Sequence, residues 1–215
     1  MTFLFVSKNT LEYINKNLDY EIPILFPVAI STERFNSSKS KDINLITVGS
    51  LVQKNGHEFL IDIIHALKKI TKRTINLKII VEGILKESLQ NKIIKLGLQE
   101  NIQLLGKVDH PEQHLQSPNL YVHGASYEPF ILVLIEAMAA GLPIISTDGL
   151  GNRDLIVNEY LVANRNYCEF AEYILQIYNT QKKHQKLSQN VRKFSKKYDI
   201  KPYVDELIKL YQASI

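Results

Sequence analysis

The 215-residue sequence contains a single cysteine, Cys168, and only 9 glycines and 7 prolines. One thiol cannot form an internal disulfide, and it excludes a zinc site built from several thiolates. This sparing use of cysteine favours a reducing compartment. With 45% hydrophobic and 22% charged residues, the composition is globular, which excludes a disordered chain, a collagen and a coiled coil as the overall class.

An uninterrupted apolar stretch of membrane-spanning length is also missing. The longest apolar run, residues 130–145, contains Glu136, Gly141 and Pro143, whereas a spanning helix needs about 20 apolar residues. The first residues have neither a basic segment nor a long apolar core, so they do not resemble a signal peptide. We therefore expect a cytoplasmic protein.

Charge of either sign is not strongly in excess. Lysine and arginine total 26, aspartate and glutamate total 22, and the net charge is +4. This falls short of the dense basic clusters of nucleic-acid-binding domains, so we expect no nucleic-acid partner. A mildly basic surface suits an anionic ligand, or a peripheral membrane contact at the acidic inner face.

Short apolar runs alternate with segments of helical periodicity along most of the chain. Strand-like runs occur at residues 43–48, 77–81, 102–105, 120–123, 143–146 and 160–162. Helical periodicity occurs at residues 57–70, 85–96 and 130–140, and from about residue 167 onward. Strict alternation with nearly continuous apolar strands predicts an α/β fold, a doubly wound, Rossmann-like parallel sheet covered by helices on both faces, with a helical C-terminus.

Small and polar residues collect where these predicted strands end. The pairs are Gly49-Ser50, Glu82-Gly83, Gly106-Lys107, His123-Gly124 and Asp148-Gly149. Ligands of doubly wound sheets bind outside the carboxyl ends of the strands. The simpler alternative is that the glycines only end strands and open turns. Because five such sites share one edge of the sheet, we expect a binding cleft there.

The first 42 residues fall outside this repeat. Residues 3–6 and 22–25 are strand-like, residues 9–17 are helical, and residues 31–42 are polar and typical of a linker. One such unit is too small for its own core, so it must pack on the main domain or on another chain. We therefore predict a division into residues 1–42 and residues 43–215.

Two glutamates flank the start of a predicted apolar helix. Pro129 suits the first helical turn, which places Glu128 at the boundary and Glu136 inside the helix. Eight residues of helix rise about 12 Å, and the free N–H groups at its start suit a diphosphate. The structural alternative is a helix cap at Glu128 and a paired carboxylate at Glu136. Spacing alone favours the structural alternative.

This segment resembles the two-glutamate motif of the retaining glycosyltransferases of family four, which have the GT-B fold. The matching residues are Glu128, Glu136, Ala137-Met138-Ala139 and Gly141-Leu142-Pro143. Residues 48–52 are similar to the family's first phosphate loop, residues 98–108 to its third strand, and residues 148–154 to its loop after the fifth strand. The resemblance covers about residues 40–200. Residues 1–35 resemble the end of the family's N-terminal acceptor domain, so residues 43–215 resemble its nucleotide-sugar-binding half.

The resemblance implies a donor site for a nucleotide-diphosphate sugar, with no metal and no separate cofactor. It assigns Glu128 to the sugar hydroxyls and Glu136 to the ribose, and makes these two the catalytic pair. It places Lys107 and Val108 at the nucleobase. The full set of implied donor-binding residues is Gly49, Ser50, Lys54, Asn55, Lys107, Val108, Ser126, Phe130 and Ile131.

Several positions depart from the family pattern. Ser50 and Asn55 stand where the family usually has arginine and lysine, Lys54 is one step early, and Ile131 replaces a common glycine. Almost the whole acceptor domain is also missing. Activity would then need an acceptor domain from a partner chain or a neighbouring segment, and the exposed apolar residues among 1–30 would recruit that partner or self-associate.

These observations leave three functional hypotheses. The first is the donor-binding domain of a retaining, metal-independent glycosyltransferase acting on a glycan or a lipid-linked acceptor. The second is a non-catalytic relative that binds nucleotide sugar or serves as an interaction subunit, which the residues at Ser50, Asn55 and Ile131 favour. The third, ranked below both, is a GT-B epimerase.

Other polar residues carry weaker signals. His110 and His114 have helical spacing but no evident third metal ligand, so a surface turn is favoured. His123 is either a core histidine or part of the cleft. The basic run at residues 182–197 is either a solvated helix face or a contact for an anionic surface. Cys168 is expected to be an ordinary helix residue.

Overall fold

The computed structural model describes residues 4–5, 24–25, 42–80, 82–126, 132–148, 161–162 and 165–213. Six parallel strands form one sheet in the order β5-β4-β3-β6-β7-β8. These strands are β3 (Ile43–Val48), β4 (Ile75–Ile80), β5 (Ile102–Gly106), β6 (Leu120–His123), β7 (Ile144–Thr147) and β8 (Leu161–Val162). Two short strands, β1 (Leu4–Phe5) and β2 (Ile24–Leu25), pair in parallel with each other.

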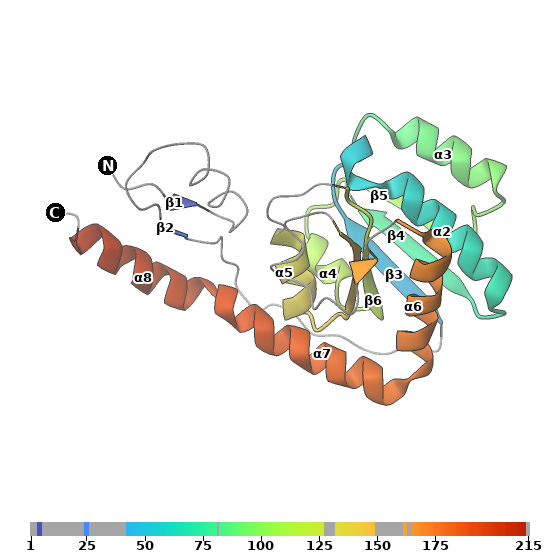
Figure 1. The fold of residues 1–215 in the computed structure, drawn as a ribbon. Helices are drawn as coiled ribbons and strands as arrows, with labels where there is room; N and C mark the ends of the chain where they lie inside the picture. The colour runs from blue at the N-terminus through green and yellow to red at the C-terminus, as the bar shows by residue number, and fades with distance from the viewer. Residues whose placement is uncertain are drawn as a thin grey trace.

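Helices cover both faces of the six-stranded sheet, as Figure 1 shows, with α2, α3 and α6 on one side and α4 and α5 on the other. The helices are α2 (His57–Ile70), α3 (Lys86–Lys95), α4 (Pro111–His114), α5 (Leu132–Ala139), α6 (Tyr167–Asn179), α7 (Gln181–Ser195) and α8 (Ile200–Ala213). Two 3-10 turns are η2 (Gln53–Asn55) and η5 (Lys196–Tyr198). The predicted fold class, a doubly wound parallel sheet with a helical C-terminus, is confirmed.

Most predicted element bounds agree with the structure to within two residues. β4 begins at Ile75, two residues before the predicted start. The prediction missed these residues because the polar Asn76 interrupts the apolar run of the strand. The strand accommodates Asn76 because its Nδ2 donates to Oδ1 of Asn44 at 2.8 Å. The predicted helix at 9–17 and most of the predicted linker lie outside the described residues, so the division at residue 42 stays a prediction.

α2 packs on the sheet through one apolar face. Its buried residues are His57, Phe59, Leu60, Ile61, Ile63, Ile64 and Leu67. Each fully buried aliphatic side chain contributes about 1.5–3 kcal/mol to folding. Ile70 is the last residue of the helix and is 52% exposed. Phe59 also meets Phe170 of α6 edge to face, with ring centroids 5.8 Å apart, so α2 anchors a second helix.

Side chains extend the short ladder between β3 and β6. Only Leu45↔Leu120 and Ile46↔Tyr121 are paired in register. At one end, Oδ1 of Asn119 accepts from the N–H of Asn44 at 2.6 Å. At the other end, the hydroxyl of Tyr121 lies 3.1 Å from both the N–H and the carbonyl oxygen of Val48. The backbones of β3 and β6 therefore diverge toward their carboxyl ends.

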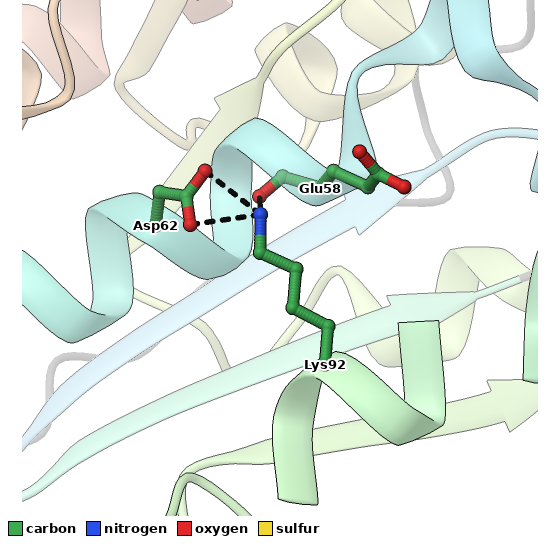
Figure 2. A network of polar contacts seen from close by, with 3 residues as sticks. All are labelled: Glu58, Asp62 and Lys92. Carbon is green, nitrogen blue, oxygen red and sulfur yellow. Dashed lines mark hydrogen bonds and ion pairs between the residues drawn. The ribbon is translucent and has the colours of Figure 1, made fainter. Parts of the chain in front are cut away.

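A lysine ties α3 to α2 on the outer face of the domain (Figure 2). Nζ of Lys92 lies 2.8 Å from both carboxylate oxygens of Asp62 and donates to the carbonyl oxygen of Glu58 at 3.0 Å. The ion pair is partly exposed, so it contributes at most about 1 kcal/mol. The ion pair positions α3 against α2 but adds little to the stability of the fold.

The C-terminal helices run from the sheet outward (Figure 1). Oδ1 of Asn166 caps α6 by accepting from the N–H groups of Cys168 and Glu169. Arg192 of α7 donates to the carbonyl oxygen of Ala140, directly after α5, at 2.9 Å. Among the described residues, none of the helices has the length and apolar character to cross a bilayer.

Two glycines allow the loop before α2 to touch the end of β6. Gly56 has a φ of +68°, and a Cβ there would overlap the carbonyl oxygen of Gly124. A Cβ on Gly124 would in turn lie 2.7 Å from the carbonyl oxygen of Gly56. Neither position accepts a side chain, so the backbones of the β3–α2 connection and of β6 are in direct contact.

Gly56→Ala should lower the free energy of unfolding by about 2–5 kcal/mol. The left-handed backbone costs alanine about 1–2 kcal/mol, and overpacking against Gly124 adds about 1–3 kcal/mol. Gly97 is the matched control, because its φ is +64° and an added Cβ meets nothing within 4 Å. Gly97→Ala should therefore lose only the backbone contribution. Urea unfolding followed by circular dichroism measures both, and equal losses would contradict the close contact.

Candidate functional site

A cavity of about 480 Å³ opens where β3 and β6 end, which is the size of a small-molecule site. The strand order reverses between these two strands, and ligands of doubly wound sheets bind at that point. The lining residues are Thr47, Val48, Gly49, Ser50, Val52, Lys54, Asn55, His57, His123, Leu132 and Val133. The predicted cleft is therefore present, at two of the five strand ends.

The loop between β3 and α2 supplies one wall of the cavity. Of the predicted donor-binding residues, the structure brings Gly49, Ser50, Lys54 and Asn55 together here. The amide of Asn55 donates its Nδ2 hydrogen to the carbonyl oxygen of Ser50 at 2.8 Å, which closes the loop on itself. Asn55 thus holds the loop in shape.

Ser126 contacts this loop rather than the cavity. Its N–H and its hydroxyl both donate to the carbonyl oxygen of Lys54, at 2.8 and 3.2 Å. Ser126 follows β6, so this pair of bonds adds to the contact between Gly56 and Gly124. The predicted residue Ser126 therefore positions Lys54.

Two histidines form the buried floor of the cavity. His57 is the first residue of α2 and is 2% exposed, and His123 is the last residue of β6 and is 5% exposed. Both alternatives for His123 hold, because it is buried and also lines the cavity. Burial lowers the pKa of His123 to about 4, with a contribution from His57, and burial also lowers the pKa of His57. Both rings are therefore neutral at pH 7.

His57 is a cavity residue that the sequence alone did not single out. Its Nε2 lies 2.9 Å from the carbonyl oxygen of Gly49 and 3.1 Å from that of Ser50. These contacts anchor the start of α2 to the loop. A histidine directly after the loop glycine was the available signal, since a helix N-terminus beside a glycine turn favours anion binding.

Lys107 and Val108 do not belong to this cavity. They follow β5, at the edge of the sheet, with β4 between that strand and β3. Lys107 is exposed and Val108 is half-buried. Their predicted role at a nucleobase would need a ligand that extends beyond the cavity across the end of β4.

Glu136 lies on the same face of α5 as two cavity residues. Leu132 and Val133 line the cavity, and residues three and four positions later share their side of a helix. Glu136 is half-buried, and burial raises the pKa of its carboxyl, with a smaller contribution from the charge of Glu112. The side chain is thus one turn beyond the cavity, in a setting that disfavours an unpaired charge.

Three of the predicted residues lie outside the described residues. These are Glu128, the other member of the predicted catalytic pair, and the two residues Phe130 and Ile131. The spacing of the two glutamates therefore stays a sequence-based prediction.

Arg165 is a second residue that sequence reasoning missed. It lies before α6 with a φ of +46°, and its Nη1 donates to the carbonyl oxygen of Gly124 at 2.9 Å. Its guanidinium lies over the ring of Phe59, 4.8 Å from the centroid. Burial lowers the pKa of Arg165 from its ordinary value. Arg165 therefore joins the end of β6 to α2 and places a positive charge behind the cavity, and no local pattern marks it.

The remaining polar candidates lie on the surface. Nδ1 of His110 is 3.2 Å from a carboxylate oxygen of Glu112 at the exposed start of α4, which fits the surface-turn interpretation. In the part of the chain that the structure describes, no three histidine, cysteine, aspartate or glutamate side chains are grouped to hold a metal. Cys168 is an exposed residue of α6.

Curated relatives share part of this chain. An uncharacterized glycosyltransferase of Methanocaldococcus jannaschii, MJ1059, is 34% identical over 132 residues, which are 60% of this chain and 32% of that protein. A second one, MJ1178, is 27% identical over 213 residues, which are 96% of this chain and 58% of that protein. The chain therefore spans about a third to three fifths of the length of these two relatives.

Solved glycosyltransferase structures share the fold. S. aureus TarM in a complex that includes UDP matches with a TM-score of 0.88 at 21% identity, over 97% of this chain and 43% of that chain. Anabaena HepE in complex with UDP and glucose matches with a TM-score of 0.86 at 17% identity, over 98% of this chain and 62% of that chain. The GtfA/B complex matches with a TM-score of 0.83 at 21% identity, over 99% of this chain and 45% of that chain.

A family profile covers most of the chain. The family described as glycosyl transferases group 1 matches residues 30–194. The match includes the whole six-stranded sheet, the loop between β3 and α2, and the residues of the cavity. The chain therefore belongs to the group 1 glycosyl transferases.

Proposed function

We propose that this chain is the nucleotide-sugar-binding half of a retaining, family-four glycosyltransferase, corresponding to the C-terminal domain of a GT-B enzyme. The observation that carries the proposal is the cavity between β3 and β6. Its described lining combines a glycine turn, Lys54, two buried imidazoles and no carboxylate. Such a lining favours a diphosphate over a cation, because every charged group in it is positive.

The chemistry proposed for this site is electrostatic. When the bond from the sugar to the diphosphate breaks, negative charge grows on the leaving phosphate. Lys54 and the free N–H groups at the start of α2 stabilise that charge, and a metal is not required. Glu136 would accept hydrogen bonds from the ribose, and Glu128 from the sugar.

We further propose that the donor is a uridine diphosphate sugar. Support comes from the solved structures of TarM and HepE, which hold UDP in the same fold. The chain's Lys107 and Val108 would then meet the uracil at the end of β5. The identity of the acceptor, a glycan or a lipid-linked saccharide, would depend on the acceptor domain.

Transfer also needs an acceptor domain. The chain covers 43% of TarM and 62% of HepE, so we propose that a partner chain or a further segment completes the cleft, with residues 1–30 as the contact. Assembly of two chains has a precedent in the GtfA/B complex. The basic helix α7, with Lys182, Lys186 and Lys193 exposed, would suit peripheral contact with the inner membrane face. We place the protein in the cytoplasm.

One observation favours a second function, a non-catalytic binding subunit. The amide of Asn55 is bonded to the carbonyl oxygen of Ser50, so neither residue supplies the positive charge that the family usually places there. A lost charged contact to a leaving group costs about 3 kcal/mol, which is roughly a hundredfold in rate. Such a chain would bind nucleotide sugars and transfer them slowly or not at all.

A ligand panel tests the proposed function. UDP-glucose and UDP-N-acetylglucosamine should raise the melting temperature of the chain, because a ligand that binds only the folded state stabilises it. ADP- and GDP-sugars at the same concentration should raise it less. The chain alone should transfer no sugar to added acceptors, since the second domain orients the reacting atoms. No shift with any nucleotide sugar would contradict the donor site, and transfer by the chain alone would contradict the need for a second domain.

Glu136→Gln should raise stability and weaken nucleotide binding. Because burial raises the pKa of Glu136, the folded state holds this proton more tightly than the unfolded chain, and ionisation above about pH 4 destabilises the fold. The variant's melting temperature should exceed that of wild type at pH 7, and the difference should vanish below about pH 4. UDP binding should weaken by about 1–3 kcal/mol, the range for a charged hydrogen bond.

Glu100→Gln is the control for this change, because Glu100 is exposed at the start of β5, at the opposite end of the strands. It should alter neither property. Calorimetry that gives equal UDP affinity for wild type and Glu136→Gln would contradict the ribose role, and a pH-independent difference in melting temperature would contradict the buried carboxyl.

Ser50→Arg should tighten UDP binding by about 0.5–1 kcal/mol at low salt. Ser50 is exposed at the cavity wall, so an arginine there would reach a bound diphosphate without disturbing the Asn55 contact, which uses the backbone of residue 50. The gain should shrink at 1 M salt, where screening acts over about 3 Å. Gln99→Arg adds the same charge at the opposite end of the strands and should have no effect. Equal affinities of Ser50→Arg and Gln99→Arg would show that residue 50 does not face the diphosphate.

A further inference from the structure

Two imidazoles from different parts of the sequence meet at the floor of the cavity. His57 begins α2, and His123 ends β6. Both histidines line the same cavity, and burial lowers the pKa of each ring. The close contact of Gly56 with Gly124 brings the backbones of the two histidines together, because each glycine is the direct neighbour of one histidine.

Each ring has a buried nitrogen with no hydrogen-bond partner among the described residues. Nε2 of His57 faces two carbonyl oxygens, those of Gly49 and Ser50, so it carries the hydrogen. The Nδ1 atom of His57 then carries a lone pair, and this atom has no hydrogen-bond partner among the described residues. Nε2 of His123 also has no partner. Oδ1 of Asn55, in the same lining, is a third buried atom without a partner among the described residues. Buried polar atoms are nearly always bonded, so these three indicate a ligand with hydroxyl donors as well as acceptor oxygens, and a nucleotide sugar carries both.

The surroundings decide which kind of ligand this is. The charged groups that face the pair are Lys54 from η2 and Arg165, which is bonded to the residue after His123. β3 contributes the hydroxyl of Thr47, and α5 contributes only Leu132 and Val133. Glu58, the next residue of α2, is exposed. Within the described lining no carboxylate stands beside either ring, so a phosphate of the ligand would supply the counter-charge for a proton there.

We propose that His57 and His123 act as one unit that binds the phosphate oxygens of the nucleotide sugar and takes up one proton from solvent as the ligand enters. This inference rests on the proposed function. The proton adds to the lone pair of Nε2 of His123 or Nδ1 of His57, and the new N–H donates to a phosphate oxygen. The two sites share a single proton, because two adjacent positive rings repel each other.

The unit replaces the missing basic residues of the loop. Ser50 and Asn55 supply no charge, whereas the arginine and lysine that the family usually has at these positions are always positive. In this chain the positive charge would exist only in the complex, on the protonated imidazole. In the free protein both rings are neutral, because burial keeps the pKa of His57 below its ordinary value and that of His123 at about 4. A bound phosphate raises that pKa, so affinity must rise as the pH falls from 8 toward 5, by at most tenfold for each pH unit.

Titration calorimetry with UDP-glucose between pH 5 and pH 8 tests this proposal. A nucleotide sugar lacks the terminal phosphate monoester whose pKa is about 6, so the ligand itself does not titrate in this range. Repeating each titration in two buffers of different ionisation enthalpy gives the number of protons taken up. Wild type should take up close to one proton at pH 7, and its affinity should increase at least fivefold from pH 7.5 to pH 6.

His57→Gln and His123→Gln are the test variants, and His65→Gln is the control. Glutamine keeps an N–H near the position of Nε2, so His57→Gln retains a donor for the carbonyl oxygens of Gly49 and Ser50 but cannot titrate. Both test variants should lose most of the proton uptake and of the pH dependence. His65 is a half-buried residue of the same helix outside the lining, and its variant should behave as wild type. Circular dichroism at each pH verifies that all variants are folded.

A second measurement keeps the proposal testable if a variant fails to fold. Histidine side-chain nitrogen signals of the intact wild-type protein, recorded by NMR at pH 6.5, should report two neutral buried rings without ligand and one cationic ring with saturating UDP-glucose.

The outcomes separate the two proposals. Binding without proton uptake, or uptake that survives in both glutamine variants, would overturn the histidine unit and leave the donor site standing. Absence of UDP-glucose binding by wild type at every pH would overturn the UDP-sugar donor and the histidine unit with it.

Discussion

The contact between the backbones of Gly56 and Gly124 is the constraint on which the site depends. The space is so narrow that a methyl group on either residue would collide with the other's carbonyl. The β3–α2 loop is thereby held against the end of β6, and Ser126 and Arg165 reinforce the contact from outside. The contact holds the start of α2 beside the end of β6, so the histidine next to each glycine lines the same cavity.

The two walls of the cavity come from parts of the chain that are far apart in sequence. One wall comes from the connection after β3, the other from β6 and α5, so the two walls are separated by more than sixty positions in sequence. Its electrostatic character follows from what the walls lack. The described lining has one lysine, two neutral imidazoles and no carboxylate, and this environment accepts negative charge more readily than positive charge.

Much of the fold was predictable from sequence, and part of the site was not. β3, α2 and β6 were predicted with their observed bounds because apolar runs end there at glycines. The start of β4 was missed because Asn76 is satisfied by a neighbouring strand, which local periodicity does not contain. Lys54 was predicted from the family resemblance. His57 gains its role from the nearby carbonyl oxygens of Gly49 and Ser50, and Arg165 gains its role from the distant carbonyl oxygen of Gly124. Glu128 lies outside the described residues and stays a prediction.

The junction of β3 and β6 has a mechanical consequence. Two register pairs hold it, against six between β3 and β4. A backbone bond from Asn119 to Asn44 and side-chain bonds of Asn119 and Tyr121 add to them. A line of sparse backbone bonding thus runs through the middle of the sheet, directly under the cavity. A molecule bound there touches both halves and acts as a clamp across that line. A ligand bound in this cavity would therefore also hold the two halves of the sheet together.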